Sequence, residues 1–165
     1  MRVVGIDPGL RITGYACVDG DPESIADPSL VEAGVFRLVS GAVTPSLSSR
    51  LVELEADVRG LLDRLEPDTA CVEGLFAHYK HPATAVAMAH ARGVILLALE
   101  ASGVGLVELK PAQVKLATVG AGRATKRQMQ MAVAARFGLS EPPEPHDVAD
   151  AMAIALAGLR RAGKT

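Results

Sequence analysis

The sequence predicts an α/β protein whose mixed five-stranded sheet carries helices on both faces. Two observations lead to this prediction: three strand-like runs joined by short turns at the amino end, and an alternation of helical and short apolar runs after them. Strands joined by short turns pair antiparallel, whereas a crossover through a helix adds a parallel strand. The 165 residues suffice for one core, so we expect a single domain over 1–165.

The first three strands are expected at Val3 to Asp7, Ile12 to Asp19 and Leu30 to Val39. The turn-rich segments DPGLR and GDPESIADPS separate them. In SLSSRLVELEADVRGLLDRLEP, aliphatic residues recur at helical spacing between acids and arginines, which predicts an amphipathic helix that ends before Pro67. The apolar run in DTACVEG is the expected fourth strand, and the crossover through this helix makes it parallel in the sheet.

The second half of the chain alternates in the same way. The stretch HPATAVAMAHARGVILLALEAS is apolar on most faces, which predicts a helix that packs on the sheet, against a partner, or both. GVGLVEL is the expected fifth strand. A short helix opens at Pro111 and another closes at Gly138. The last helix follows the proline-rich segment EPPEP, and about 159–165 should form a flexible tail.

The composition is that of an ordinary globular protein in a reducing compartment. Hydrophobic residues make up 49% of the chain and charged residues 22%. Cys17 and Cys71 stand alone within apolar runs, without the spacing of a zinc site, which indicates buried thiols and favours the cytoplasm. The longest apolar run, VILLAL, is far shorter than the ~20 residues of a membrane span. We therefore expect neither export nor membrane insertion.

The charges are unevenly distributed. A net charge of −2 does not by itself favour nucleic-acid binding. Between Lys110 and Ser140, however, the chain has no acid and six basic residues: Lys110, Lys115, Arg123, Lys126, Arg127 and Arg136. Two interpretations stay open at this point, a solvated helix face and a track for an anionic partner.

Two buried-looking strands end in a carboxylate. Asp7 closes the run VVGID, and Glu73 closes the run CVE. Taken singly, Asp7 suits a turn residue in Asp-Pro-Gly and Glu73 suits an exposed strand end. If these strands are parallel neighbours, both side chains lie at the same sheet edge, where ligands bind in open α/β sheets.

Two further acids stand three residues apart at the start of the last helix. Asp147 and Asp150 lie about 60° apart around the helix axis and so share one face. One alternative makes Asp147 the N-cap and Asp150 the third helical residue, in a near capping box. Asp150 fits this alternative less well, because the apolar AMAIALAG follows it and a buried carboxylate needs a partner or a cation.

Four converging carboxylates would repel one another and raise their pKa values unless cations bind between them. Oxygen ligands without cysteine favour Mg²⁺ or Mn²⁺. A pair of such ions can activate a water and stabilise the leaving oxygen in phosphodiester hydrolysis. These acids therefore predict a nuclease-like centre with two metal ions.

The residues that carry a resemblance to a known family are GIDPGLRITGY, CVEGLF, KPAQVK with GRATKRQMQ, and HDVADAMAIAL. In this order, and over essentially the whole chain, they resemble the RuvC family of Holliday-junction resolvases, which have a ribonuclease-H-like fold. The resemblance implies a homodimeric, divalent-metal-dependent endonuclease that makes paired symmetric nicks in a four-way DNA junction and leaves 5′-phosphate and 3′-hydroxyl ends. It also implies RuvA and RuvB, the branch-migration proteins, as partners.

The resemblance assigns roles to individual residues. The catalytic and metal-binding acids of the family fall on Asp7, Glu73, Asp147 and Asp150. Its DNA-contacting positions fall on Phe76, Lys115 and Lys126. Within the acid-free segment, Arg123 and Arg127 extend a phosphate-binding track.

Some assignments stay open. His146 is either a further ligand or base, or a polar loop residue, and Tyr79 is either a base-stacking residue or part of the core. The alanine-rich helix from about 82 to 101 is a candidate dimer contact or a helix packed only within its own subunit.

Three other functions share some of these features. A YqgF-like nuclease of the same fold shares the opening GID-x-G pattern but lacks the contexts of VEGLF and DVADAMAIAL, and a junction-binding scaffold would bind without cutting. An actin-like ATPase needs two lobes, which 165 residues cannot supply.

Overall fold

The predicted sheet is present with its mixed pairing. The computed structural model describes residues 1–24, 28–74 and 82–162. Within these residues the sheet has five strands in the order β3-β2-β1-β4-β5, which confirms the expected α/β architecture. The strands are β1 (Arg2–Asp7), β2 (Ile12–Asp19), β3 (Ser29–Arg37), β4 (Thr69–Glu73) and β5 (Gly105–Leu109). The helices are α1 (Leu47–Leu65), α2 (Pro82–Ala101), α3 (Pro111–Val119), α4 (Lys126–Arg136) and α5 (His146–Ala162).

Strand pairing follows from the length of each connection. β1 pairs antiparallel with β2, and β2 with β3. β4 lies parallel to β1 after the crossover through α1, and β5 lies parallel to β4 after the crossover through α2. The carboxyl ends of β1, β4 and β5 therefore point to one edge of the sheet.

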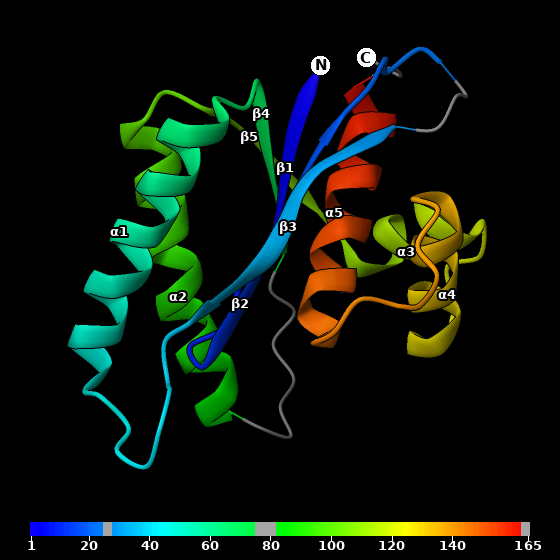
Figure 1. Ribbon diagram of the computed structural model, residues 1–165. Coiled ribbons are helices and arrows are strands. Elements are labelled where there is room, and N and C mark those ends of the chain that lie inside the picture. Colours follow the sequence, from blue (N-terminus) through cyan, green and yellow to red (C-terminus); the bar gives the residue numbers. More distant parts are fainter. Residues whose placement is uncertain (25–27, 75–81, 163–165) are drawn as a thin grey trace.

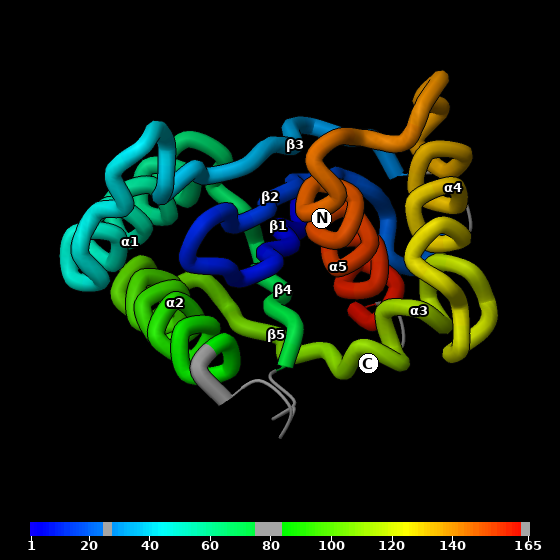
Figure 2. Tube along the Cα trace, turned by 90° about the horizontal axis from the view of Figure 1, so that it is seen from below, coloured from blue at the N-terminus to red at the C-terminus, as the bar shows by residue number. Residues whose placement is uncertain are grey.

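Helices cover both faces of the sheet (Figures 1 and 2). α1 and α2 lie on one face, and α5 lies on the other with α3 and α4 beyond it. Side chains alternate along each strand, so Val4 and Ile6 pack with α1 and α2, whereas Val3 and Cys71 pack with α5. By the same alternation, Asp7 and Glu73 belong to the α5 face.

The backbone of helix α5 packs directly against the backbone of strands β1 and β2. A Cβ atom added to Gly5 would lie 2.4 Å from the carbonyl oxygen of Ala151 and 2.4 Å from the amide nitrogen of Ala155. One added to Gly14 would lie 2.1 Å from the carbonyl oxygen of Asp147. Both positions on the strands therefore need glycine, because any side chain would push the helix away.

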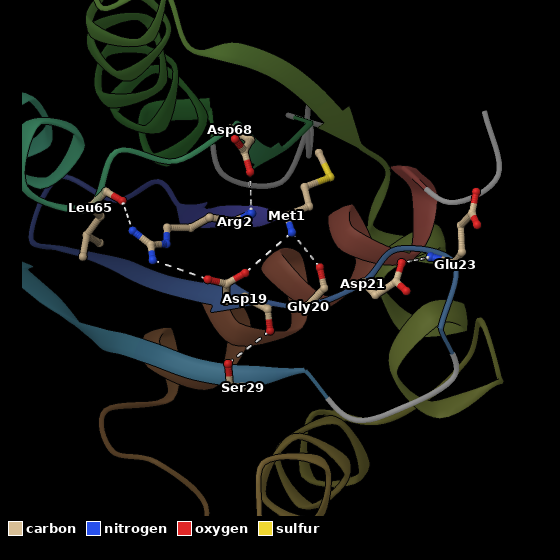
Figure 3. A network of polar contacts seen from close by, with 9 residues as sticks. All are labelled: Met1, Arg2, Asp19, Gly20, Asp21, Glu23, Ser29, Leu65 and Asp68. Carbon is tan, nitrogen blue, oxygen red and sulfur yellow. Dashed lines mark hydrogen bonds and ion pairs between the residues drawn. The ribbon is translucent and has the colours of Figure 1, made fainter.

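Polar contacts hold the opposite edge of the sheet, at the start of β1 (Figure 3). The Arg2 guanidinium donates to the carbonyl of Leu65 at 2.8 Å and to Asp19 at 3.4 Å. The backbone N–H of Arg2 donates to Asp68 at 2.7 Å. These bonds join β1 to β2 and to the end of α1.

The helix ends agree with the sequence signals. The Ser46 side chain accepts the Ser49 N–H at the start of α1, and the helix stops before Pro67 as predicted. Thr125 and Gln128 form a capping box at the start of α4. Their bonds fix the direction in which Lys126, the first residue of α4, leaves the loop.

Several strand ends differ by one or two residues from the sequence prediction, and two differences affect the core. β3 ends at Arg37 instead of Val39, since Leu38 leaves the strand to enter the core at 1% exposure. The expected flexible tail from about residue 159 is corrected for 159–162, because α5 continues to Ala162. Leu159 is buried there, and the Arg160 side chain donates to the carbonyl of Ala117 in α3.

Helix α2 has an unusual composition for a helix with one exposed face. Within the described part of the chain, Thr84–Ala101 is the one segment long and apolar enough to span a membrane, by length and composition alone. Its Ala91, Ile95 and Leu99 are buried in the same cluster as the core residues of α1. Its exposed large apolar residues are Val86 and Leu97, at 56% and 64% exposure.

Candidate active site

Asp7 and Glu73 lie side by side at the carboxyl edge of the sheet. In the parallel pair of β1 and β4, Ile6 is opposite Val72, and Asp7 and Glu73 are the next residues along each strand. Both strands are buried almost to their ends, since Ile6 and Val72 are each 0% exposed. The sheet therefore brings two distant carboxylates to one place, as the sequence predicts.

The turn after Asp7 is fixed by one buried hydroxyl. Thr13 is 0% exposed, and its Oγ1 donates to the carbonyl of Gly9 at 2.6 Å and accepts the Gly9 N–H at 3.1 Å. Asp7 itself is paired in register with Gly14 of β2. Asp7 is thus the last strand residue before this turn, which holds the backbone on its carboxyl side.

Helix α5 brings the other two acids to this edge. It begins at His146, so Asp147 lies within the first turn, and the alternative that made Asp147 the N-cap is wrong. The carbonyl of Asp147 rests against Gly14, as described above. Asp150 lies one turn further along the helix, directly before the buried segment from Ala151 to Leu159.

A pocket of about 350 Å³ opens among these elements. Three of the four acids line it, Asp7, Glu73 and Asp150, together with His146, Lys115 and Lys126. Met88 of α2 and Val114 of α3 are among its apolar lining residues. Asp147 does not line it, although its charge acts on Asp7 and 19% of its side chain is exposed. The pocket therefore joins acids from three segments to two lysines from the acid-free segment.

The acids lie close enough to change one another's protonation. Burial, followed by the charges of Asp150, Glu73 and Asp147, raises the pKa of Asp7 to about 8. Burial and the charge of Asp150 raise the pKa of Glu73, while Lys115 and Lys126 act in the opposite direction. Burial also raises the pKa of Asp150, against the lowering effect of Lys126 and His146. A cation in the pocket would relieve this repulsion.

The pocket fits a divalent cation in charge and donor chemistry. Its carboxylate oxygens are the ligands that hard cations such as Mg²⁺ prefer. Across the described residues, no three His, Cys, Asp or Glu side chains stand close enough together to hold an ion as they lie. Ion binding would therefore have to bring the carboxylate oxygens closer together, against the repulsion between like charges.

The predicted DNA contacts divide into three groups. Lys115 and Lys126 line the pocket itself. Arg123 and Arg127 are exposed, in the loop before α4 and in its first turn, and do not line it. Phe76 and Tyr79 lie outside the described residues.

Sequence reasoning missed two residues of α2 near the acids. Met88 lines the pocket, and Arg92, one helical turn later, contacts the end of β4. Arg92 had a signal in the sequence, because it is the one arginine in an alanine-rich apolar helix. Its partners could not be predicted from the sequence, since they lie on the strands β4 and β5.

The fold and the acid-lined pocket first indicate the class of protein: a nuclease with a ribonuclease-H-like fold. The family model of the crossover junction endodeoxyribonuclease RuvC matches residues 3–158. The chain is 42% identical to that enzyme from Rhodopirellula baltica, over 94% of this chain and 84% of the relative. It is 43% identical to the enzyme from Chloroflexus aggregans, over 94% of this chain and 91% of the relative.

The chain belongs to the RuvC family of crossover junction endodeoxyribonucleases. A solved structure of Thermus thermophilus RuvC in complex with Holliday junction substrate superimposes with a TM-score of 0.89 at 30% identity, covering 99% of this chain and 96% of that one. The chain is thus a hydrolytic nuclease that resolves four-way junctions, and the family implies dependence on a divalent metal ion. The match favours this function over the YqgF-like alternative.

Proposed function

We propose that Asp7, Glu73, Asp147 and Asp150 are the catalytic acids and that together they bind two Mg²⁺ or Mn²⁺ ions. The observation that carries this proposal is that Asp7, Glu73 and Asp150, from β1, β4 and α5, line one pocket, where burial and then neighbouring acids raise the pKa of each carboxyl. Buried carboxylates that repel one another destabilise the folded chain. Such clusters are typical of functional sites, where a bound cation stabilises them.

Ions bound by these acids would activate the attacking water and stabilise the leaving oxygen at the scissile phosphate. The chain's own residues position the reaction. Asp7 and Glu73 are held by paired strands, and Asp150 by a buried helix, so the carboxylates have rigid supports. Lys115 and Lys126 neutralise part of the negative charge at the pocket, where the phosphate would bind. The products would carry 5′-phosphate and 3′-hydroxyl ends.

The DNA would follow the acid-free segment away from the pocket. Lys115 and Lys126 are proposed to contact the phosphates nearest the scissile bond. Arg123 and Arg127 would extend the contact along the exposed start of α4. Phe76 lies three residues after Glu73 in the sequence and is proposed to stack on a base at the junction point.

Paired symmetric nicks require two active sites, and we propose a homodimer that supplies them. A four-way junction has approximate two-fold symmetry, which an isologous dimer matches. The contact proposed is the exposed side of α2, where Val86 and Leu97 leave apolar surface uncovered within the described chain. RuvA and RuvB are proposed partners, and the cytoplasm is the proposed location.

The test offers a synthetic four-way junction to the protein and to its Asp7→Asn variant, with Mg²⁺, Mn²⁺ or chelator. Paired nicks are expected only from the parent protein with metal, and junction binding should persist in the variant. Equal nicking by both proteins would remove Asp7 from the mechanism. Binding without any metal-dependent nicking would select a junction-binding scaffold instead.

A further inference from the structure

Arg92 of α2 reaches across to the ends of two strands. Its Nε donates to the backbone carbonyl of Glu73 at 3.5 Å, at the point where β4 ends. Its Nη2 forms an ion pair with the carboxylate of Glu108 in β5. One guanidinium thus joins a helix on one face of the sheet to the two neighbouring strands β4 and β5.

Arg92 is largely buried, unlike the arginine of a typical surface ion pair. The Arg92 side chain is only 14% exposed, although Glu108 is 56% exposed. The bond to Glu73 is long, so the ion pair with Glu108 contributes most to fixing the guanidinium. The planar fork of arginine serves both partners at once, whereas a lysine ammonium cannot reproduce that geometry.

The end of β4 needs such a support. Glu73 is opposite Leu109 of β5, and the next N–H, of Gly74, donates to the Leu109 carbonyl at 2.9 Å. Pairing with β1 on the other side reaches only Val72. Asp7 and Asp150 line the same pocket as Glu73, so ionised carboxylates there repel one another. Repulsion therefore acts on a strand end that is paired on one side only.

We infer that Arg92 is a positioning residue, which holds the end of β4 so that the Glu73 carboxylate faces the other acids at the spacing that metal binding requires. Glu108 anchors Arg92 for this task. The inference rests on the proposed role of Glu73 as a metal ligand. Met88, one turn earlier in α2, lines the pocket directly, so the same helix shapes the site and holds one of its acids.

The test uses Arg92→Lys, Arg92→Gln and Glu108→Gln in the full-length protein. We expect single-turnover cleavage of a four-way junction by Arg92→Lys to fall about ten- to a hundredfold, the usual effect of removing a residue that orients a metal ligand. Direct Mn²⁺ binding, followed by the electron paramagnetic resonance signal of free Mn²⁺, should weaken by a similar factor. Junction affinity in chelator should stay within about twofold. Glu108→Gln should show a smaller loss of both cleavage and Mn²⁺ binding.

Arg64→Lys is the matched control, because Arg64 also joins a helix to a strand through an ion pair, with Glu32 of β3. It should cleave and bind Mn²⁺ like the parent. All assays are run well below the unfolding temperature of each variant, so that loss of folding does not enter. Parent-like cleavage and Mn²⁺ affinity in Arg92→Lys would overturn the inference. So would weaker junction binding with unchanged Mn²⁺ affinity, since Arg92 would then be a DNA contact.

The inference and the proposed function fail in different ways. If the parent protein makes no metal-dependent nicks, or Asp7→Asn nicks equally well, the proposed catalytic site is wrong. If the parent behaves as proposed and Glu73→Gln loses Mn²⁺ affinity while Arg92→Lys does not, only the role of Arg92 is wrong.

Discussion

The two ends of strand β1 have opposite electrostatics. At its start, Arg2 is bonded to Asp19, to the Leu65 carbonyl and, through its backbone N–H, to Asp68 (Figure 3). At its end, only five residues later, Asp7 is buried beside three other acids, and burial followed by their charges raises its pKa to about 8. One end contributes stability through paired charges, and the other gathers acids whose charges Lys115 and Lys126 compensate only in part. The proposed catalytic site lies at the end where the charges are only partly compensated.

The largest expected effect is on the cleavage rate, which substitutions near the end of β1 should lower and substitutions near its start should not. Glu73→Gln or Asp150→Asn should slow junction cleavage about a thousandfold or more, because losing metal-ion charge stabilisation costs several kcal/mol in the transition state. Single-turnover cleavage of a labelled junction measures this loss. Asp68→Asn, at the opposite edge of the sheet, is the control and should cleave like the parent. A similar loss in Asp68→Asn would contradict the separation.

The next effect is on stability at the start of β1. Arg2→Met should lower the free energy of unfolding by about 1 to 3 kcal/mol, because it leaves the Leu65 carbonyl without its donor and removes one of the two cationic partners of Asp19. Urea unfolding followed by circular dichroism measures the change. The folded variant should retain the cleavage rate of the parent. An unchanged unfolding midpoint with slower cleavage would show that this edge also serves the active site.

A third prediction concerns the pH dependence of stability at the end of β1. The pKa of Asp7 is raised from 3.8 in a free side chain to about 8, so between these values the folded state binds more protons than the unfolded state. In the metal-free protein, protonated Asp7 therefore adds to the free energy of unfolding. This contribution is complete at low pH and is lost as the pH rises toward 8. Asp7→Asn removes this dependence.

At pH 8.5, in chelator, Asp7→Asn should accordingly be more stable than the parent by more than about 1.4 kcal/mol, the equivalent of one pKa unit. The difference should vanish near pH 4. Thermal unfolding of both proteins across this range is the measurement. A parent protein whose stability rises with pH relative to the variant would show that Asp7 is not held in a repulsive environment.

The smallest expected effect concerns the exposed basic residues away from both ends. Arg123→Ala and Arg127→Ala should each weaken junction binding severalfold and reduce the slope of log affinity against log salt by about 1. Cleavage at saturating protein should be unchanged, because neither residue lines the acid pocket. Junction binding at several salt concentrations tests this, with Arg59→Ala in α1 as a control that should leave the slope unchanged.

Much of this arrangement could be predicted from the sequence, because it depends on local patterns. Alternation and turn residues define the strands, and the acids stand at strand and helix ends that the crossover rule brings to one edge. The continuation of α5 through Arg160 could not be predicted, since its partner is the Ala117 carbonyl of another helix. Arg92 was missed for the same reason, because Glu108 is 16 residues away in sequence. Contacts between elements leave little trace in a single sequence.

The glycine contacts under α5 have a consequence for how such a site tolerates mutation. Gly5 and Gly14 let the main chain of the helix rest on the main chain of the strands, so the longitudinal alignment of α5 is set by backbone shape. Substitutions among the surrounding aliphatic side chains should therefore leave the spacing between Asp7 and Asp150 unchanged, as long as the total side-chain volume is kept.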